Sequence, residues 1–305
     1  MHRTGHAGQR AEEPRQTCAG TSRLALRGTQ DRSRRHGDRT AGLCRPVPGR
    51  RPFFLSLDTI TFVLVHGTGH GGWCWKFVRG ILEGQGHRVY TPTLTGCGER
   101  SHLLHPGIGL ETHITDIVNV LEWEELDSVV LVGHSYGGCV VSGVADRAKD
   151  RLRHLVYLDT VVLSDGESLV GSRRQMSEAE GDADIERRRS MAPDGKYIVA
   201  RSGEFYGIPP EPAEILKWVN RRLTPHPLKS WLEPVKFENG GEQGVPRTFI
   251  RCTDPEMPFS GIRDHAMFAK EHPEWRYEEL ATGHDAMVTE PQACADLFLA
   301  AAQSS

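Results

Sequence analysis

The stretch VVLVGHSYGG, residues 129–138, decides the fold of this 305-residue chain. Its first four residues are apolar and typical of a buried strand, and the small residues at its end indicate a helix packed closely beneath that strand. Between them, residues 133–137 form a G-x-S-x-G pentapeptide around Ser135. Glycines suit a tight strand-to-helix turn, because a side chain at either flank would collide with the neighbouring strand or helix. The stretch therefore predicts an exposed serine hydroxyl at the N-terminus of a helix.

Strand-like and helix-like segments alternate on both sides of this turn. Strands are predicted at 59–65, 89–94, 128–132, 152–158, 247–251 and 275–280, and helices at 73–83, 111–126, 137–148, 262–271 and 291–301. This alternation predicts an α/β fold with a mostly parallel sheet flanked by helices. It stops between residues 163 and 245, where charged and Pro-rich stretches surround a helical piece at 213–222. An insertion of that size between strands is expected to form a lid over a substrate pocket.

Composition and charge narrow the class of protein. Hydrophobic residues make up 38% of the chain and charged residues 25%, as in ordinary globular proteins. No apolar run is long enough to cross a membrane, so no membrane partner is expected. Residues 1–57 carry a formal charge of +8 and residues 58–305 one of −11, and an acidic body is not typical of nucleic-acid binding.

The Arg-rich residues 1–57 show neither helical nor strand periodicity. We expect a disordered extension there, which a misplaced start site would also explain, followed by one folded domain over 58–305. The chain has seven cysteines, an odd number with no CxxC pair, which predicts reduced thiols in a cytoplasmic protein. The sequence leaves the oligomeric state open, with a homodimer as one alternative.

A serine hydroxyl becomes a good nucleophile only when a base takes its proton. His284 lies directly after the last predicted strand, where such a base is expected. The acid that orients the histidine should lie between the two in the chain. We expect Asp254, which follows the strand at 247–251, and we keep Glu256 and Asp159 as alternatives.

The loop after the first strand, HGTGHGG at 66–72, predicts half of an oxyanion hole. We expect the backbone amides of Thr68 and Tyr136 to hold the developing negative charge. The same loop contains a G-x-G-x-x-G pattern, but the next strand ends without the acid that would hold a ribose, so no nucleotide cofactor is expected. His66 and His70 lie on this loop rather than on one helix face, so no metal site is expected either.

Three segments together resemble the α/β-hydrolase superfamily: FVLVHGTGHGGWCW (62–75), LVGHSYGG (131–138) and ELATGHDAM (279–287). They are most similar to the branch that contains plant methyl-ester esterases, salicylate-binding esterases and hydroxynitrile lyases, with bacterial relatives. The resemblance covers nearly all of 58–305 and implies an α/β-hydrolase fold. It places the nucleophile at Ser135, the histidine at His284 and the oxyanion amides at Thr68 and Tyr136. The family's acid does not align clearly with residues 254–256, which leaves the acid open.

The lyases of this branch carry a lysine directly after the histidine and a glutamate where this chain has His134. Here Asp285 follows the histidine, and its charge would repel a departing cyanide if the side chain faced the pocket. The resemblance therefore implies a cofactor-free serine hydrolase that cleaves carboxylic esters of small, partly apolar molecules. Two alternatives remain: cleavage of a carbamate, amide, lactone or C–C bond by the same residues, and a non-catalytic small-molecule receptor.

Overall fold

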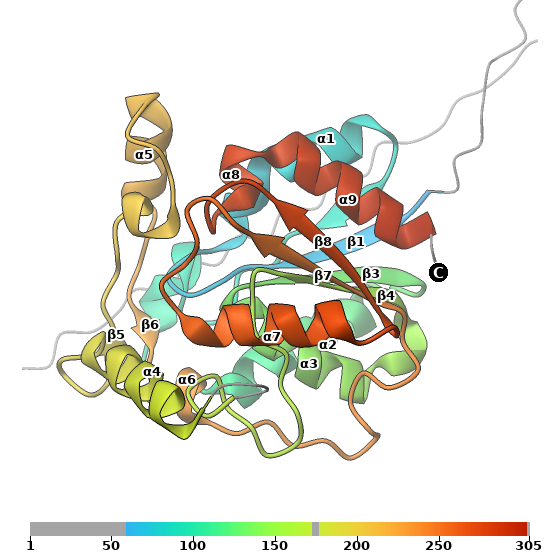
Figure 1. Ribbon diagram of the computed structural model, residues 1–305. Helices are drawn as coiled ribbons and strands as arrows, with labels where there is room; N and C mark the ends of the chain where they lie inside the picture. Colours follow the sequence, from blue (N-terminus) through green and yellow to red (C-terminus); the bar gives the residue numbers. More distant parts are fainter. Residues whose placement is uncertain (1–58, 173–176, 304–305) are drawn as a thin grey trace, which may run out of the picture. The chain divides into compact units, whose positions relative to one another are not determined.

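A parallel sheet organises the computed structural model, which describes residues 59–172 and 177–303. The predicted disorder of residues 1–57 lies outside these residues. Six strands pair in the order β2-β1-β3-β4-β7-β8, and every neighbouring pair is parallel (Figure 1). The strands are β1 (Thr61–Val65), β2 (Arg88–Tyr90), β3 (Val129–His134), β4 (Leu152–Leu158), β7 (Arg247–Cys252) and β8 (Trp275–Leu280).

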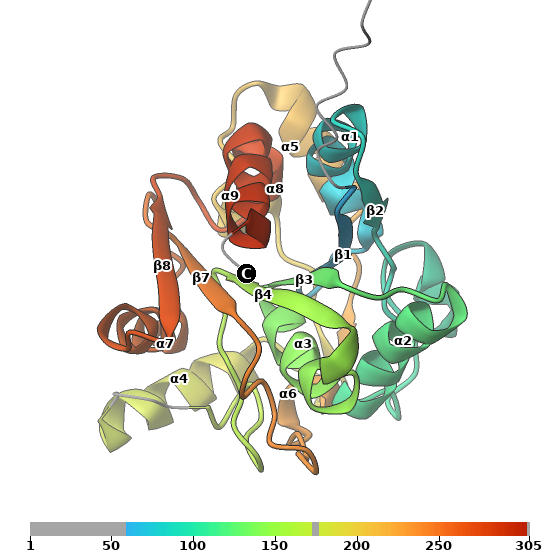
Figure 2. The ribbon, with the colours of Figure 1, turned by 90° about the vertical axis from the view of Figure 1, so that its right-hand side faces the viewer.

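Helices cover both faces of the sheet, as Figure 2 shows. One face packs against α2 (Leu110–Trp123), α3 (Tyr136–Arg147) and α7 (Ser260–Glu271); the other packs against α1 (Lys76–Gly84), α8 (Ala286–Thr289) and α9 (Pro291–Gln303). Strand β1 shows why both faces are filled. Its residues Val63 and Val65 belong to the first core, whereas Phe62 and Leu64 belong to the second. A strand buried on both faces needs this continuous apolar run, because successive side chains point to opposite sides.

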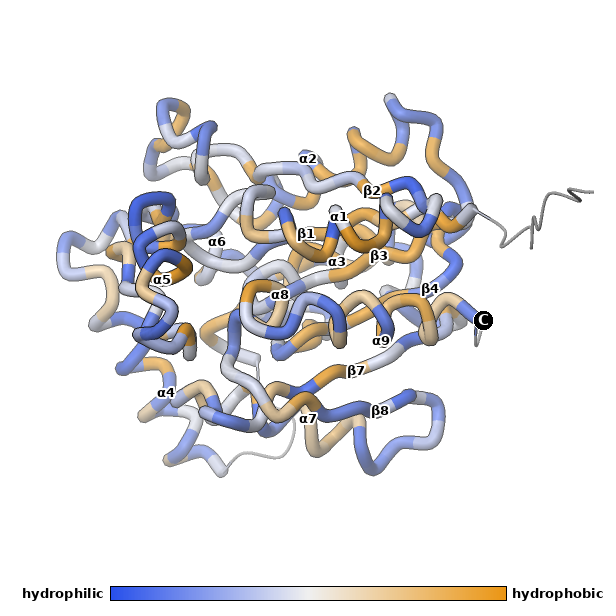
Figure 3. The backbone as a smooth tube through the Cα atoms, turned by 90° about the horizontal axis from the view of Figure 1, so that it is seen from above, coloured by the Kyte–Doolittle hydropathy of each residue, from blue (hydrophilic) through white to orange (hydrophobic). Residues whose placement is uncertain are grey.

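The hydropathy pattern follows the position of each strand in the sheet. Figure 3 shows hydrophobic residues along the inner strands β1 and β3 and mostly hydrophilic residues along β8. Strand β8 lies at the edge of the sheet, and apart from Trp275 its residues are only partly buried or exposed. Charged side chains there discourage pairing with another strand. Strand β2 ends at Tyr90, earlier than predicted, before Pro92, which has no N–H to offer a sheet ladder.

The segment between β4 and β7 contains α4 (Glu178–Ser190), β5 (Tyr197–Ile198), α5 (Ala213–Asn220), β6 (His226–Pro227) and α6 (Lys229–Leu232). Strands β5 and β6 form a separate antiparallel pair. We call this segment, residues 163–245, the lid segment; its helices gather at one end of the sheet in Figure 1. Short 3₁₀ helices cover Gly72–Trp75, Gly98–Leu103, Lys149–Arg151 and Gly203–Tyr206.

Helix α4 was not predicted from the sequence. It has no continuous apolar face, so helical periodicity does not reveal it. A capping box begins it: the Ser177 side chain accepts a hydrogen bond from the Glu180 amide, and the Glu180 carboxylate accepts one from the Ser177 amide. The S-x-x-E pattern at residues 177–180 is the sequence signal that could have predicted the start of this helix. Within residues 59–172 and 177–303, no helix is long and apolar enough to span a bilayer.

Candidate active site

Ser135 lies at the turn between β3 and α3 in a strained backbone conformation. Its φ of 54° and ψ of −125° fall where side-chain-bearing residues are rare. The flanking glycines make the turn possible. A Cβ atom on Gly133 would lie 2.6 Å from the Gly137 carbonyl oxygen, and one on Gly137 would lie 2.6 Å from that of Val65. The close approach of strand and helix, predicted from the pentapeptide, is therefore present in the structure.

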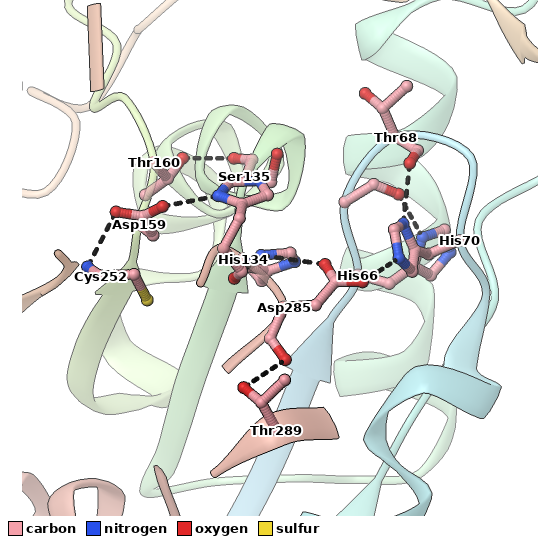
Figure 4. Close-up of polar contacts among 12 residues, drawn as sticks. His66, Thr68, His70, His134, Ser135, Asp159, Thr160, Cys252, Asp285 and Thr289 are labelled. Atoms are coloured by element: carbon pink, nitrogen blue, oxygen red, sulfur yellow. Dashed lines mark hydrogen bonds and ion pairs between the residues drawn. The ribbon is translucent and has the colours of Figure 1, made fainter. Parts of the chain in front are cut away.

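The neighbouring strand β4 and the loop after it hold this turn in place. The Ser135 amide donates to the carbonyl oxygen of Leu158 at 3.1 Å. The hydroxyl of Thr160 donates to the Ser135 carbonyl oxygen, as Figure 4 shows. Both contacts come from the end of β4 and the loop that follows it, so β4 fixes the backbone of Ser135. The side chain of Ser135 lines a pocket beneath the lid segment.

His284 lies in the loop between β8 and α8, and its ring is 1% exposed. Its Nδ1 lies 2.6 Å from Oδ2 of Asp159, which is also 1% exposed. A carboxylate only accepts, so Nδ1 carries the proton and donates it to Asp159. In this tautomer Nε2 has a free lone pair, and within the described part of the chain Nε2 has no hydrogen-bond partner. His284 is thus prepared to accept a proton at Nε2.

The expected acid, Asp254, is not the residue that the structure places against the histidine. Asp254 is exposed and lies in the turn after β7, where its backbone amide donates to the Thr282 carbonyl at 3.1 Å. Glu256 is also exposed and forms an ion pair with Arg251. Asp159, retained as an alternative, comes from the end of β4 instead. The prediction of Asp254 is therefore corrected to Asp159.

The backbone explains why Asp159 is suited to this position. Its amide donates to the Ile250 carbonyl at 2.7 Å, and its φ of 44° turns the side chain out of the strand direction. Oδ1 then accepts a hydrogen bond from the Cys252 amide at 3.0 Å (Figure 4), and Oδ2 lies 2.6 Å from Nδ1 of His284. Both carboxylate oxygens are thus occupied by donors, which fixes the carboxylate plane relative to the imidazole.

Thr68 and Tyr136, the two residues expected to supply the oxyanion amides, line the same pocket as Ser135. Tyr136 is the first residue of α3, and the amides at a helix N-terminus lack partners within the helix. The Thr68 side chain accepts a hydrogen bond from Nε1 of Trp231 at 2.9 Å. Among the hydrogen bonds of residues 59–172 and 177–303, none uses the amide of Thr68 or Tyr136. Both N–H groups remain available for a ligand oxygen.

A second buried histidine–carboxylate pair lies beneath the oxyanion loop. His70 Nε2 lies 2.9 Å from Oδ2 of Asp285, and His70 Nδ1 lies 2.8 Å from the Thr68 carbonyl oxygen. Since both neighbours accept, both ring nitrogens donate, and the ring is an imidazolium. Burial opposes this charge, but the Coulomb attraction of Asp285 and its hydrogen bond outweigh burial and raise the pKa of His70. The pair ties the loop of Thr68 to the residue that follows His284.

This pairing changes the expected role of Asp285. Its side chain is fully buried and bonds His70, and it is not among the residues that line the pocket of Ser135. Direct repulsion of an anion in the pocket, considered from the sequence, does not follow from this arrangement. His134 points away from the pocket and donates through Nε2 to the His284 carbonyl oxygen at 3.0 Å. Burial lowers the pKa of His134, so this ring is neutral.

Neither loop histidine is arranged as a metal ligand. His66 Nε2 accepts from the Leu94 amide at 3.0 Å, and its Nδ1 donates to the Gly67 carbonyl at 2.8 Å. Burial lowers the pKa of His66 to about 3, which keeps it neutral. Both of its ring nitrogens are therefore occupied, as are those of His70. No cluster of three or more candidate metal ligands occurs in the part of the chain that the structure describes.

The pocket that Ser135 lines is narrow, with a cavity volume of about 30 Å³. Aromatic, aliphatic and thioether side chains dominate its wall, and one guanidinium interrupts them. The lid segment supplies Leu169, Arg188, Met191, Phe205, Tyr206 and Trp231, and the loop after β7 with the start of α7 supplies Met257, Phe259 and Ile262. The lid segment therefore forms a large part of the pocket wall.

Comparison with known proteins identifies the family. The model of the alpha/beta hydrolase family matches residues 62–297, and the chain belongs to this family. It is 39% identical over 249 residues to a carbendazim hydrolyzing esterase of Nocardioides sp. (strain SG-4G), which covers 78% of this chain and 98% of the relative. It is 27% identical over 266 residues to putative methylesterase 14, chloroplastic, of Arabidopsis thaliana, covering 82% of this chain and 74% of the relative.

Solved structures agree on the fold. An extracellular alpha/beta-hydrolase from a Paenibacillus species, described as sharing homology with tobacco salicylic acid binding protein 2, superimposes with a TM-score of 0.66 at 23% identity. The match covers 79% of this chain and 98% of that one. The predicted α/β-hydrolase fold, and the predicted kinship with plant methylesterases and their bacterial relatives, are both confirmed.

Proposed function

We propose that this protein hydrolyses carboxylic esters of small, partly apolar molecules, with Ser135 as nucleophile and His284 as general base. One observation carries the proposal: the 2.6 Å bond to Asp159 fixes His284 in the tautomer that leaves Nε2 free to take a proton. The strained turn presents Ser135 in a pocket with the unused amides of Thr68 and Tyr136. These are the groups that acyl transfer requires.

The proposed reaction assigns each of these groups the role that its chemistry allows. Ser135 Oγ attacks the ester carbonyl carbon as its proton moves to Nε2 of His284, and the carbonyl oxygen becomes an anion held by two amides. Nε2 then gives the proton to the departing alkoxide, which leaves as an alcohol and a Ser135 acyl ester. Water attacks this ester with His284 again as base, and the acid is released. Asp159 stabilises the imidazolium that forms in both halves of the reaction.

The relatives support this class of enzyme, since their names describe esterases and methylesterases. The carbendazim hydrolyzing esterase also gives weight to the carbamate alternative, because carbendazim is a methyl carbamate. Attack on a carbamate carbonyl needs the same nucleophile, base and oxyanion amides as attack on an ester. We therefore propose ester cleavage as the main activity and carbamate cleavage as the second candidate.

The test is turnover of p-nitrophenyl esters from acetate to octanoate, with carbendazim assayed on the same preparation. We expect the shorter esters to be preferred, since the cavity beside Ser135 is narrow, with a volume of about 30 Å³. Ser135→Ala and His284→Ala should each lower kcat by on the order of 10⁶, because nucleophile and base act as a unit. More than a few per cent activity in either variant would refute the assignment. Labelling of Ser135 by a fluorophosphonate without any turnover would instead indicate a receptor.

A further inference from the structure

A single cation, Arg188, reaches the wall of the pocket that contains Ser135. It comes from helix α4 of the lid segment, and only 3% of its surface is exposed. The rest of the wall from the lid segment is aromatic, aliphatic or thioether, so this guanidinium is an exception in an apolar surrounding. A buried charge is costly unless its hydrogen-bonding groups have partners. The partners of Arg188 therefore indicate what the pocket is built to bind.

The guanidinium is held firmly but is only partly satisfied. Its Nε donates to Oδ2 of Asp184 at 2.7 Å, one turn earlier on α4. Its Cζ lies 4.8 Å from the ring centroid of Phe259 and 5.9 Å from that of Trp231, so aromatic faces fix its plane. Among the hydrogen bonds of residues 59–172 and 177–303, the Nε bond is the only one that the Arg188 side chain makes. The N–H groups on its two Nη atoms are therefore left to a ligand.

Stability alone does not account for this pair. The desolvation cost of burying an ion pair is about as large as the attraction between its charges. Replacing such a pair by apolar side chains of similar size often leaves a protein equally stable or more stable. Here both partners are buried, and one of them faces the reaction pocket.

The charge balance decides which kind of ligand group fits. Asp184 already compensates the charge of Arg188, so the buried pair is neutral; Arg187, 3.6 Å from the other oxygen of Asp184, is half-exposed and its charge is screened by solvent. A carboxylate on the ligand would add a buried negative charge without a counter-ion, which is unfavourable. A neutral acceptor, such as a carbonyl oxygen or an aromatic nitrogen, receives the Nη hydrogens without adding charge. The aromatic residues Phe205, Tyr206 and Trp231 around it favour a flat ring.

We propose that Arg188 is a specificity-determining residue that binds a neutral hydrogen-bond acceptor on an aromatic ring of the ester, away from the carbonyl that Ser135 attacks. This inference rests on the proposed function. The substrate class is then a small aromatic or heteroaromatic ester with an acceptor on its ring, and the lid segment contributes selectivity as well as cover.

The experiment compares esters that differ by one ring atom. Methyl benzoate is paired with methyl nicotinate and methyl isonicotinate on the acyl side, and phenyl acetate with 3-pyridyl acetate on the alcohol side. The readout is the ratio of kcat/KM between each pyridine ester and its benzene partner, corrected by the ratio of their alkaline hydrolysis rates. In this ratio, any loss of kcat/KM that affects both esters of a pair equally cancels.

In at least one pair, Arg188→Met should lower this ratio by roughly 10- to 100-fold, the usual effect of losing a hydrogen bond to a charged donor. The change should appear mainly in KM, because the contact is made equally in ground and transition states. Arg188→Met leaves the buried Asp184 with only the half-exposed Arg187, 3.6 Å away, as an ion-pair partner, so the double variant Arg188→Met/Asp184→Asn is measured alongside it. Arg189→Met, an exposed neighbour on the same helix, is the matched control and should leave the ratio unchanged.

A reciprocal variant tests the charge argument. Asp184→Asn leaves the guanidinium uncompensated, so monomethyl terephthalate should gain at least about 10-fold in kcat/KM relative to methyl benzoate. Wild-type preference for the carboxylate ester would overturn the neutral-acceptor class. Ratios that stay the same in every Arg188 variant, while the wild type turns over all the esters, would overturn the role of Arg188 alone. A wild type that neither hydrolyses these esters nor reacts with a fluorophosphonate would refute the proposed function, and the inference with it.

Discussion

Replacing Asp159 by asparagine changes one atom of the hydrogen-bond chain that prepares His284. In the wild type, Oδ2 accepts the Nδ1 proton at 2.6 Å and Oδ1 accepts the Cys252 amide at 3.0 Å. An asparagine that keeps its oxygen toward Cys252 turns its NH₂ group toward Nδ1. The proton of His284 must then move to Nε2, where the lone pair is needed. In the opposite rotamer the NH₂ group faces the Cys252 amide, so two hydrogen-bond donors face each other.

The expected loss in kcat is roughly 10⁴, or about 5.5 kcal/mol of transition-state stabilisation. Water cannot replace the lost acceptor, because both side chains are 1% exposed. The assay is p-nitrophenyl acetate turnover, with circular dichroism and thermal unfolding to show that the variant is folded. Asp254→Asn is the matched control, since Asp254 is exposed, and it should change kcat less than about threefold. If Asp254→Asn loses most of its kcat while Asp159→Asn stays nearly as active as the wild type, the reasoning is refuted and Asp254, the acid expected from the sequence, is restored.

Three further outcomes follow from the structure. A chain that begins at Asp58 should hydrolyse esters like the full chain, because the proposed catalytic groups all lie within residues 59–303; insolubility of the shortened chain alone would contradict this. Mandelonitrile cleavage should be undetectable beside ester turnover, because no lysine follows His284; cyanide release that depends on Ser135 and rivals ester turnover would overturn it. Asp285→Asn should lower the free energy of unfolding by about 3 kcal/mol near pH 6. The loss should become smaller as the pH rises. The pKa of His70 is higher in the folded protein than its unfolded value of 6.5, so the ion pair contributes its whole stability below pH 6.5 and none above the folded pKa. Equal losses near pH 6 and near pH 9 would contradict the ion pair.

The sequence reveals the sheet and the strained turn because their signals are local. An apolar run such as the one in β3 is typical of a strand in a parallel sheet that is covered on both faces. The glycines around Ser135 are required by contacts to the immediately adjacent strand and helix. His284 could be found because it follows the last strand directly. The motifs themselves are local in the chain, although Gly137 also packs against Val65 of the neighbouring strand β1.

The acid and the lid segment depend on long-range packing. Strands β4, β7 and β8 lie side by side, so the ends of both β4 and β7 approach the loop of His284. Spacing alone does not reveal that Asp159 turns inward at a φ of 44° while Asp254 remains exposed. Arg188 belonged to a stretch that looked uniformly charged, and only the packing of α4 against α7 and Phe259 buries it. Tertiary contacts determine the positions of Asp159 and Arg188, and such contacts produce no periodic pattern in the sequence.

The most direct test of Ser135 as the nucleophile of a His284-dependent hydrolase is covalent labelling with a fluorophosphonate, followed by peptide mapping and by ester turnover on the same samples. We expect stoichiometric label on Ser135, loss of turnover in step with labelling, and much slower labelling of His284→Ala. Label on another residue, or a fully labelled protein that still hydrolyses esters, would contradict the assignment.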